Sequence, residues 1–143
     1  MTEIKNLMTK EIIKIKAHTT IQNAYNEMHL QGIRHLPVVD TMGKLIGIIS
    51  DRDIQSAMTF NPDDTVENFM SWPVEVIDEN TSVEEVTRKM IQLKVSALAV
   101  TGPGLYIKGI ITTDDLLKYL LELLGTSEVS RTLPLTQLKW RNF

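Results

Sequence analysis

The chain repeats itself without a gap, and this internal repeat limits its possible folds more than any other feature. The stretch "GIISDRD" at 47–53 returns as "GIITTDD" at 109–115, so the second copy follows the first by 62 residues (109 − 47). Between 4–54 and 66–116 about 11 positions are identical, and most other apolar positions stay apolar. Such a chain is expected to fold as two similar units related by a pseudo-twofold axis.

Each copy carries the pattern of a β-α-β-β-α unit, so the expected fold class is α+β. Short stretches rich in β-branched residues at 12–16 and 74–78 predict the first strands. Thr20 and Ser82 precede apolar positions at helical spacing, and Ser82 with Glu85 forms the pattern of a capping box. Two further strands and a closing helix are expected in each copy: "HLPVV", "LIGIIS" and a helix from near Asp51 in the first, and "ALAVT", "YIKGIIT" and a helix from Thr113 to about Leu124 in the second.

A unit of about 60 residues buries a small core by itself, because small domains keep a large share of their surface exposed. Two units stacked face to face enlarge that core, and the axis between them creates two equivalent clefts. The expected organisation is a first unit at 1–60 with its core at 4–58, a linker at 61–65, a second unit at 66–125, and a C-terminal tail at 126–143 outside the repeat.

The composition argues against several functional classes. The 143 residues include 15 basic and 18 acidic side chains, and the formal charge of −3 gives no field that would draw the protein onto nucleic acid. The absence of cysteine excludes disulfides, thiolate metal ligands and a cysteine nucleophile, and it fits the reducing cytoplasm, where we expect the protein. The longest apolar stretch, "LLKYLLELL" at 116–124, is too short to span a bilayer, so we expect no membrane association.

No pattern in the sequence indicates catalysis or a metal site. The histidines at 18, 29 and 35 have no spacing that would build a metal site with a nearby carboxylate, and no Ser-His-Asp arrangement is indicated. We therefore expect neither an enzyme nor a metal-binding protein. Met28 and Met90 fall at the same place in the two copies and are expected to lie in the core.

The repeated motif admits two interpretations. Ser50 with Asp53, and Thr112 with Asp115, each follow the S/T-x-x-D pattern of a helix cap, which requires no ligand. Alternatively, the hydroxyl and the unpaired N–H groups of a helix start can hold a phosphate. An ionised aspartate only accepts hydrogen bonds, which suits the two hydroxyls of a ribose. The cap and the ligand site can both be real.

The run "LMTKEIIKIKAHTTIQNAYNEMHLQGIRHLPVVDTMGKLIGIISDRDI" resembles a CBS domain, a cystathionine-beta-synthase-type domain, and the two copies together resemble a Bateman module over roughly 4–124. The most specific parts are "IRHLPVVD" and "GIISDRDI". The resemblance implies a stand-alone regulatory module for energy or metabolite sensing that needs no cofactor. Such modules bind an adenosine-containing ligand, such as AMP, ADP, ATP or S-adenosylmethionine, in the clefts between paired domains.

The resemblance also implies two composite clefts. Family members use basic residues at the positions of Arg34 and His35 to reach the phosphates. The flat apolar walls that a purine needs are expected from β-branched residues of the strands. The first cleft is expected to contain Arg34, His35, Ser50, Arg52 and Asp53 with Val74, Val95 and Ser96 opposite, and the second to contain Thr112 and Asp115 facing Thr9, Ile12, Ile13 and Ile33.

The two clefts are expected to differ in their affinity for phosphate, because the second copy lacks the basic residues of the first. The counterparts of Arg34, His35 and Arg52 in the second copy are Ser96, Ala97 and Asp114. The first cleft is therefore the expected phosphate site. The second is expected to hold a less charged adenosyl ligand or to stay empty.

The expected partners are the adenosyl ligand and a second copy of the chain in a homodimer. The apolar helix at 113–124 provides a dimer surface or, alternatively, completes the internal core. Two other functions stay open, namely a dimerisation scaffold with empty clefts and a regulatory part of a larger enzyme or transporter assembly. The tail at 126–143, which contains Trp140 and Phe143, is either a docking segment or packs on its own domain.

Overall fold

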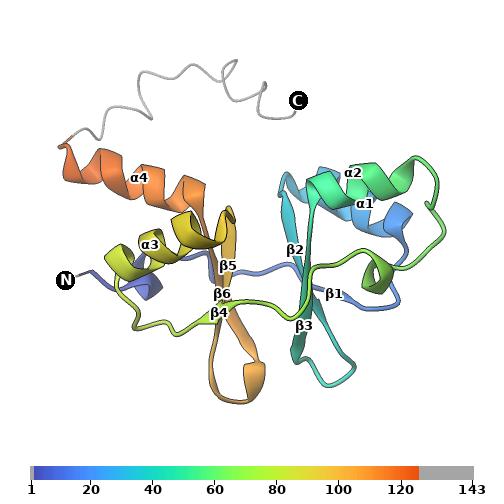
Figure 1. Ribbon diagram of the computed structural model, residues 1–143, viewed down its shortest axis with the longest axis horizontal. Helices are drawn as coiled ribbons and strands as arrows, with labels where there is room; N and C mark the ends of the chain where they lie inside the picture. Colours follow the sequence, from blue (N-terminus) through green and yellow to red (C-terminus); the bar gives the residue numbers. More distant parts are fainter. Residues whose placement is uncertain (1, 126–143) are drawn as a thin grey trace.

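The computed structural model describes residues 2–125, and these form two units that lie side by side (Figure 1). The β-α-β-β-α order predicted for each copy is confirmed. The first unit consists of β1 (Ile15–Lys16), α1 (Ile21–Gln31), β2 (His35–Val39), β3 (Leu45–Ser50) and α2 (Asp51–Met58). The second consists of β4 (Val76–Ile77), α3 (Val83–Leu93), β5 (Ala97–Thr101), β6 (Ile107–Thr112) and α4 (Thr113–Leu123). Three short 3-10 helices complete the fold: η1 (Ile4–Asn6), η2 (Val66–Asn68) and η3 (Pro103–Leu105).

The two sheets have the same topology and register, which agrees with the gapless repeat. In each sheet the first strand pairs parallel to the second, and the second pairs antiparallel to the third. Val38 pairs with Gly47 in the first sheet, and Val100 pairs with Gly109 in the second. Each sheet also has a register shift directly after that valine. The expected pair of α+β units is therefore confirmed.

The first strand of each unit is shorter than predicted. The β-branched stretches at 12–16 and 74–78 form strands only at Ile15–Lys16 and Val76–Ile77. The residues before each strand leave the sheet, and Ile12 and Val74 line cavities between the units instead. A β-branched residue suits either environment, so composition alone could not separate them.

The helix boundaries follow from their caps. Thr20 accepts a hydrogen bond from the N–H of Asn23, and α1 ends at Gly32, whose φ of 65° is the left-handed conformation that glycine adopts most readily. Ser82 accepts from the N–H of Glu85, but in the described residues the reciprocal bond of the predicted capping box does not form. The cap of α3 is therefore one-sided.

Each unit completes its core with residues from the other copy of the sequence. Ile4, fully buried, packs with Val86 and Ile111 of the second unit, while Val66 packs in the core of the first. The backbone repeats this exchange, because the N–H of Ile4 donates to the carbonyl of Thr81 and the N–H of Val66 to that of Thr19, each at 2.9 Å. Figure 1 shows the N-terminal segment beside α3 accordingly. The repeat in sequence and the unit of packing are thus not the same set of residues.

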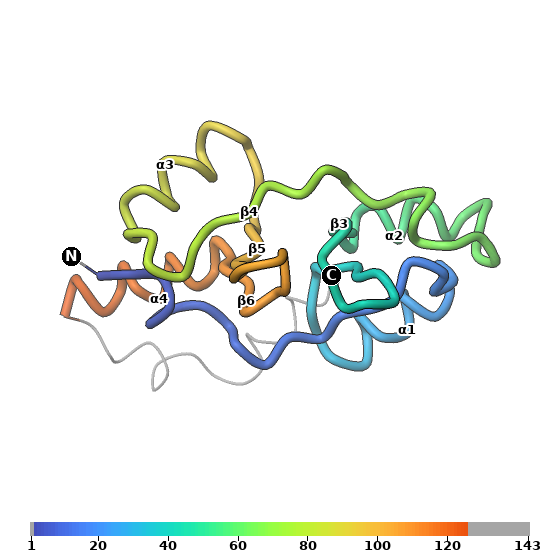
Figure 2. Tube along the Cα trace, turned by 90° about the horizontal axis from the view of Figure 1, so that it is seen from below, coloured from blue at the N-terminus to red at the C-terminus, as the bar shows by residue number. Residues whose placement is uncertain are grey.

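The exchange requires two segments to cross between the units, and they do so on opposite sides of the sheets (Figure 2). Thr9 bridges to Ile110 on one side, and Ser71 bridges to Ile48 on the other. A Cβ atom at Gly109 would lie 2.9 Å from the carbonyl oxygen of Thr9, closer than real Cβ atoms approach. The repeated glycine of the motif is therefore explained by the close passage of the crossing segment.

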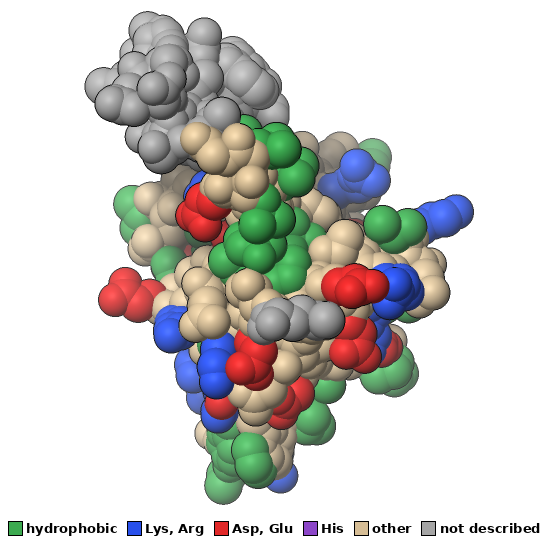
Figure 3. Space-filling view, turned by 90° about the vertical axis from the view of Figure 1, so that its left-hand side faces the viewer, with side chains coloured by type: hydrophobic (Ala, Val, Ile, Leu, Met, Phe, Trp, Pro, Cys, Tyr) green, Lys and Arg blue, Asp and Glu red, His purple; other side chains and the backbone are tan. Residues whose placement is uncertain are grey.

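The two closing helices pack differently. Helix α2 buries Ile54 and Ala57 against the first core, whereas α4 buries none of its residues, and only its Leu116 reaches the second core. The exposed leucines of α4, together with Leu124 directly after it, contribute to an apolar surface on the side of the molecule that Figure 3 shows. We call them the α4 leucine face: Leu117, Leu120, Leu123 and Leu124. In residues 2–125 no helix is both long and apolar enough to cross a membrane.

Candidate functional site

Two cavities open between the units. The first, of about 280 Å³, lies at the start of α4, and we call it the Thr112 cleft. The second, of about 830 Å³, lies at the start of α2, and we call it the Ser50 cleft. Protein pockets for small ligands usually measure about 300–1,000 Å³, so the Ser50 cleft lies within this range and the Thr112 cleft lies just below it.

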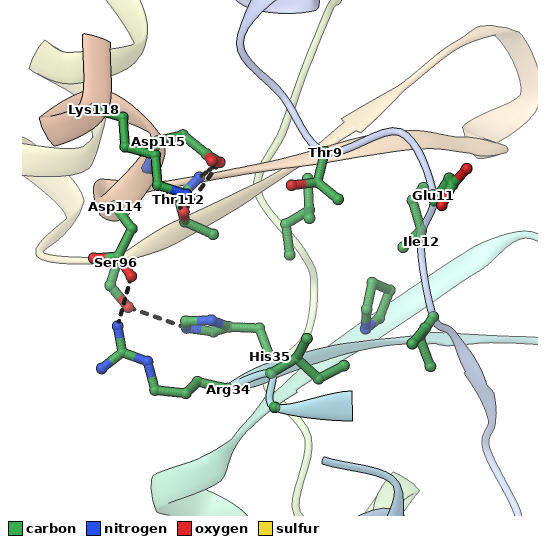
Figure 4. Close-up of a pocket in the computed structure, with 15 residues that line it drawn as sticks. Thr9, Glu11, Ile12, Arg34, His35, Ser96, Thr112, Asp114, Asp115 and Lys118 are labelled. Carbon is green, nitrogen blue, oxygen red and sulfur yellow. Dashed lines mark hydrogen bonds and ion pairs between the residues drawn. The ribbon is translucent and has the colours of Figure 1, made fainter. Parts of the chain in front are cut away.

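The Thr112 cleft brings together residues from both units (Figure 4). Thr112 and Asp115 of the second unit lie across from the segment that approaches β1. The six residues that the sequence assigned to this cleft all line it: Thr9, Ile12, Ile13, Ile33, Thr112 and Asp115. The cleft therefore has a polar wall at the start of α4 and an apolar wall on the opposite segment.

The Ser50 cleft has the corresponding composition. Ser50, Arg52 and Asp53 line it from the start of α2, and Val74, Val95 and Ser96 line it from the second unit. Arg34 and His35 belong to it as expected, but both also line the Thr112 cleft. The sequence had assigned these two residues to one cleft only. The two cavities thus share part of one wall.

The capping boxes expected from the repeated motif form in both units. Thr112 donates to Asp115 Oδ2 through its N–H at 2.9 Å and its hydroxyl at 3.0 Å, and the N–H of Asp115 donates back to Oγ1 of Thr112 at 3.3 Å. Ser50 and Asp53 make the same three bonds. In both cases Oδ2 accepts, and Oδ1 accepts no hydrogen bond from residues 2–125. The aspartate can therefore serve the cap and a ligand hydroxyl together.

The helix starts have fewer unpaired N–H groups than the sequence suggested. The N–H of Asp51 donates to the carbonyl of Arg34, and that of Thr113 donates to the carbonyl of Ser96. The cap residues and the aspartates use their own N–H groups in the capping boxes. Because most first-turn donors are occupied, a phosphate in either cleft would depend mainly on basic side chains.

The structure adds basic side chains that sequence reasoning missed. Lys118 lines the Thr112 cleft, and Lys94 lines the Ser50 cleft. A signal for Lys118 was present, because it follows Asp115 by three residues and therefore lies on the same face of α4. Lys94 ends α3 in the left-handed conformation at φ 57°, where the first copy has Gly32. No local sequence pattern indicated that Lys94 would line a cleft.

The wall between the clefts is held by two polar contacts (Figure 4). The Nη2 of Arg34 lies 3.4 Å from Oδ2 of Asp114, and Nε2 of His35 lies 3.1 Å from the hydroxyl oxygen of Ser96. Both contacts join the first unit to the second. The predicted difference in basic residues between the two copies is therefore located at the boundary of the two clefts.

The protonation of His35 is set by its place in this wall. Burial lowers the pKa of His35 below its ordinary value of 6.5. The carboxylate of Asp51 opposes this lowering, while the guanidinium of Arg34 adds to it. The carboxylates of Asp114 and Asp53 oppose it more weakly. His35 is therefore neutral at pH 7, and the wall carries a permanent charge on Arg34 alone among the residues that line both clefts.

We expect His35 to lower the stability of the folded protein in mild acid. Because its pKa is lower in the folded than in the unfolded protein, the unfolded chain binds more protons below about pH 6.5, and stability falls as the pH falls. His35→Gln removes this proton uptake, so its Tm should decline less than that of the unchanged protein between about pH 7.5 and 5.5. The exposed His18→Gln serves as the control and should keep the unchanged slope. Equal slopes for all three proteins would contradict the assignment.

Comparison with known proteins agrees with this architecture. A family model described as CBS domain matches the chain twice, at residues 4–60 and 66–122. The CBS domain pair of protein MJ0100, solved in complex with 5′-methylthioadenosine and S-adenosyl-L-methionine, has a TM-score of 0.79 at 31% identity, covering 84% of this chain and 96% of that one. The cytosolic domain of the Mg²⁺ channel MgtE, solved in complex with ATP, has a TM-score of 0.72 at 28% identity, covering 82% of this chain and 48% of that one.

One curated relative is a much longer protein than this chain. The L-aspartate semialdehyde sulfurtransferase of Methanosarcina acetivorans is 33% identical over 117 residues, which is 82% of this chain. The chain spans only 23% of the length of that relative. The chain belongs to the CBS domain family and contains two CBS domains in tandem.

Proposed function

We propose that this protein is a regulatory module that binds an adenosine-containing ligand in the clefts between its two CBS domains. The observation that carries the proposal is the pairing, in each cleft, of a capped aspartate with an apolar wall from the other unit. Oδ1 of Asp53 or Asp115 suits a ribose hydroxyl, and the β-branched wall suits a purine ring. The MJ0100 domain pair, which was solved with two adenosyl ligands, supports this class of ligand.

The charges around the clefts favour different ligands. The Ser50 cleft is lined by three cations, Arg34, Arg52 and Lys94, which suit the phosphates of AMP, ADP or ATP. They balance the three carboxylates that also line it, those of Asp51, Asp53 and Glu75. The Thr112 cleft has Lys118 close to the carboxylates of Asp114 and Asp115. We therefore propose a phosphorylated adenosine ligand for the Ser50 cleft. A less charged or cationic one, such as S-adenosylmethionine, suits the Thr112 cleft.

The ligand acts by changing how the two units pack. Each cleft has walls from both units, so a ligand that contacts both walls favours one relative arrangement over another. Its differential affinity for the two arrangements is the free energy available for signalling. The α4 leucine face suits a second copy of the chain, and we propose a homodimer that transmits the change to a regulated partner.

Calorimetric titration of the full chain with AMP, ADP, ATP, S-adenosylmethionine and 5′-methylthioadenosine tests the proposal. We expect binding of at least one of them, with a matching rise in Tm. Light scattering at micromolar concentration is expected to show a dimer, and Leu120→Asp should convert it to a monomer without loss of ligand binding, because Leu120 lines neither cleft. The absence of heat and of any thermal shift at millimolar ligand would contradict the proposed function.

A scaffold with empty clefts is the alternative that the α4 leucine face favours, since an exposed apolar face suits an interface whether or not ligands bind. A blank ligand panel together with a tight oligomer would support it. The match covers only 23% of the sulfurtransferase relative, which favours a second variant in which the module regulates a larger assembly. Affinity purification that identifies a stable enzyme or transporter partner would support that variant.

A further inference from the structure

Three residues line both clefts, namely Arg34, His35 and Ser96. Arg34 and Ser96 are equivalent positions of the two copies and line the same two cavities, so the wall that contains them lies near the pseudo-twofold axis. The repeat is broken there, because one copy contributes a guanidinium and the other a hydroxyl. With His35 neutral, the common wall offers one permanent cation to two clefts.

The present partner of Arg34 holds it weakly. The distance from its Nη2 to Oδ2 of Asp114 is 3.4 Å, and the two side chains are 57% and 55% exposed. Ion pairs this exposed contribute little to stability, because solvent screens the charges and two long side chains must be held in one geometry. A phosphate in either cleft offers a doubly charged acceptor and can therefore displace Asp114 as the partner.

Movement of Arg34 toward the Ser50 cleft changes the charge of the other cleft. The Thr112 cleft then keeps Lys118 as its own cation beside three carboxylates, and Asp114 loses its counter-ion. These carboxylates belong to Glu11, Asp114 and Asp115. The Ser50 cleft is also lined by three carboxylates, those of Asp51, Asp53 and Glu75. It is nevertheless less dependent on Arg34, because Arg52 and Lys94 also line it, whereas the Thr112 cleft has Lys118 alone. Withdrawal of one guanidinium thus makes the Thr112 cleft unfavourable for an anion.

We propose that the two clefts are coupled through Arg34: a phosphorylated adenosine ligand in the Ser50 cleft lowers the affinity of the Thr112 cleft for a second phosphorylated ligand. The inference rests on the proposed function. An adenosyl ligand without a phosphate does not attract the Arg34 guanidinium and leaves the affinity of the neighbouring cleft unchanged. The pair of clefts therefore favours one phosphorylated and one unphosphorylated ligand.

The test compares the AMP affinity of the Thr112 cleft with its neighbour filled and with its neighbour blocked. Val95→Trp places an indole in the Ser50 cleft, and Val95 does not line the Thr112 cleft. Asp53→Ala provides a second blocked variant. At low ionic strength we expect AMP to bind the Thr112 cleft about three- to tenfold more tightly in the blocked variants than in the second binding step of the unchanged protein.

Arg34→Gln should abolish this difference, and its exposed side chain makes loss of folding an implausible cause. Arg52→Gln is the matched control, because Arg52 lines the Ser50 cleft but not the Thr112 cleft. This variant should weaken AMP binding in the Ser50 cleft and retain the difference in AMP affinity of the Thr112 cleft. With 5′-methylthioadenosine, which has no phosphate, the two states should bind equally.

Each other outcome overturns the coupling. Equal AMP affinity in the filled and blocked states, a difference that persists in Arg34→Gln, or the same difference with 5′-methylthioadenosine would each do so. If AMP binds the unchanged protein once and the blocked variants not at all, the coupling is wrong while the proposed function stands. If no adenosyl ligand binds any variant, the proposed function itself fails.

Discussion

Replacing Ile4 by alanine is expected to lower the free energy of unfolding by about 2–5 kcal/mol, although residue 4 lies near the chain terminus. Ile4 is fully buried against Val86 and Ile111 of the second unit, and its N–H donates to the carbonyl of Thr81. The truncation leaves a cavity that the surrounding strands and helix can only partly close. Because domains of this kind are stable by about 5–15 kcal/mol, the loss is a large share of the total.

Urea unfolding followed by circular dichroism measures this loss. Ile91→Ala is the matched control, since Ile91 is 71% exposed on α3 and its truncation should change stability by less than about 0.5 kcal/mol. Hydrogen exchange in Ile4→Ala should rise first in the second sheet, β4 to β6, and not in the first. A loss of stability equal to that of Ile91→Ala would show that Ile4 does not belong to the core of the second unit. Faster hydrogen exchange confined to β1 to β3 would show the same.

Replacing the capped aspartates by asparagine is expected to weaken ligand binding by about 10- to 100-fold in the affected cleft, because a hydrogen bond to a charged acceptor is lost. Asp53→Asn should act on the Ser50 cleft and Asp115→Asn on the Thr112 cleft. The amide oxygen still accepts the N–H of the cap residue, so stability should fall by only about 1 kcal/mol. Calorimetry for the affinity and urea unfolding for the stability separate the two roles.

The control for this pair is Glu85→Gln. Glu85 occupies the same third position of a helix, α3, but lines neither cleft, and its side chain makes no reciprocal capping bond in the described structure. It should leave both affinity and stability nearly unchanged. If the aspartate variants lose stability in proportion to affinity, the carboxylates act only as caps, and the ribose contact is contradicted.

Much of the architecture could be predicted because it depends on local patterns that occur twice. The gapless repeat predicted two equivalent units, and the paired registers of Val38 with Gly47 and Val100 with Gly109 agree with it. The capping boxes at Ser50 and Thr112 were predicted for the same reason, since a cap involves residues only three apart. Short-range chemistry of this kind is fully encoded within each copy.

The cleft composition was predicted in part. The grouping of Thr9, Ile12 and Ile33 with Thr112 came from the family resemblance, and the structure places these residues around one cavity. The role of each as a ligand contact stays a prediction. Lys94 and the double position of Arg34 were missed, because they depend on how the two units meet and no local pattern reports that. The predictions for the tail with Trp140 and Phe143 concern residues outside the described part of the chain.

The sequence by itself determined the two-unit α+β fold, the capped helix starts and the unequal distribution of basic residues between the copies. Only the tertiary structure decided which copy completes which core, how few N–H groups the helix starts leave unpaired, and that one guanidinium borders two clefts. The physical reason is one of range. Caps and strand patterns are set by neighbours along the chain, whereas burial, charge sharing and cavity walls depend on segments such as those around Ile4 and Thr81, which meet only after folding.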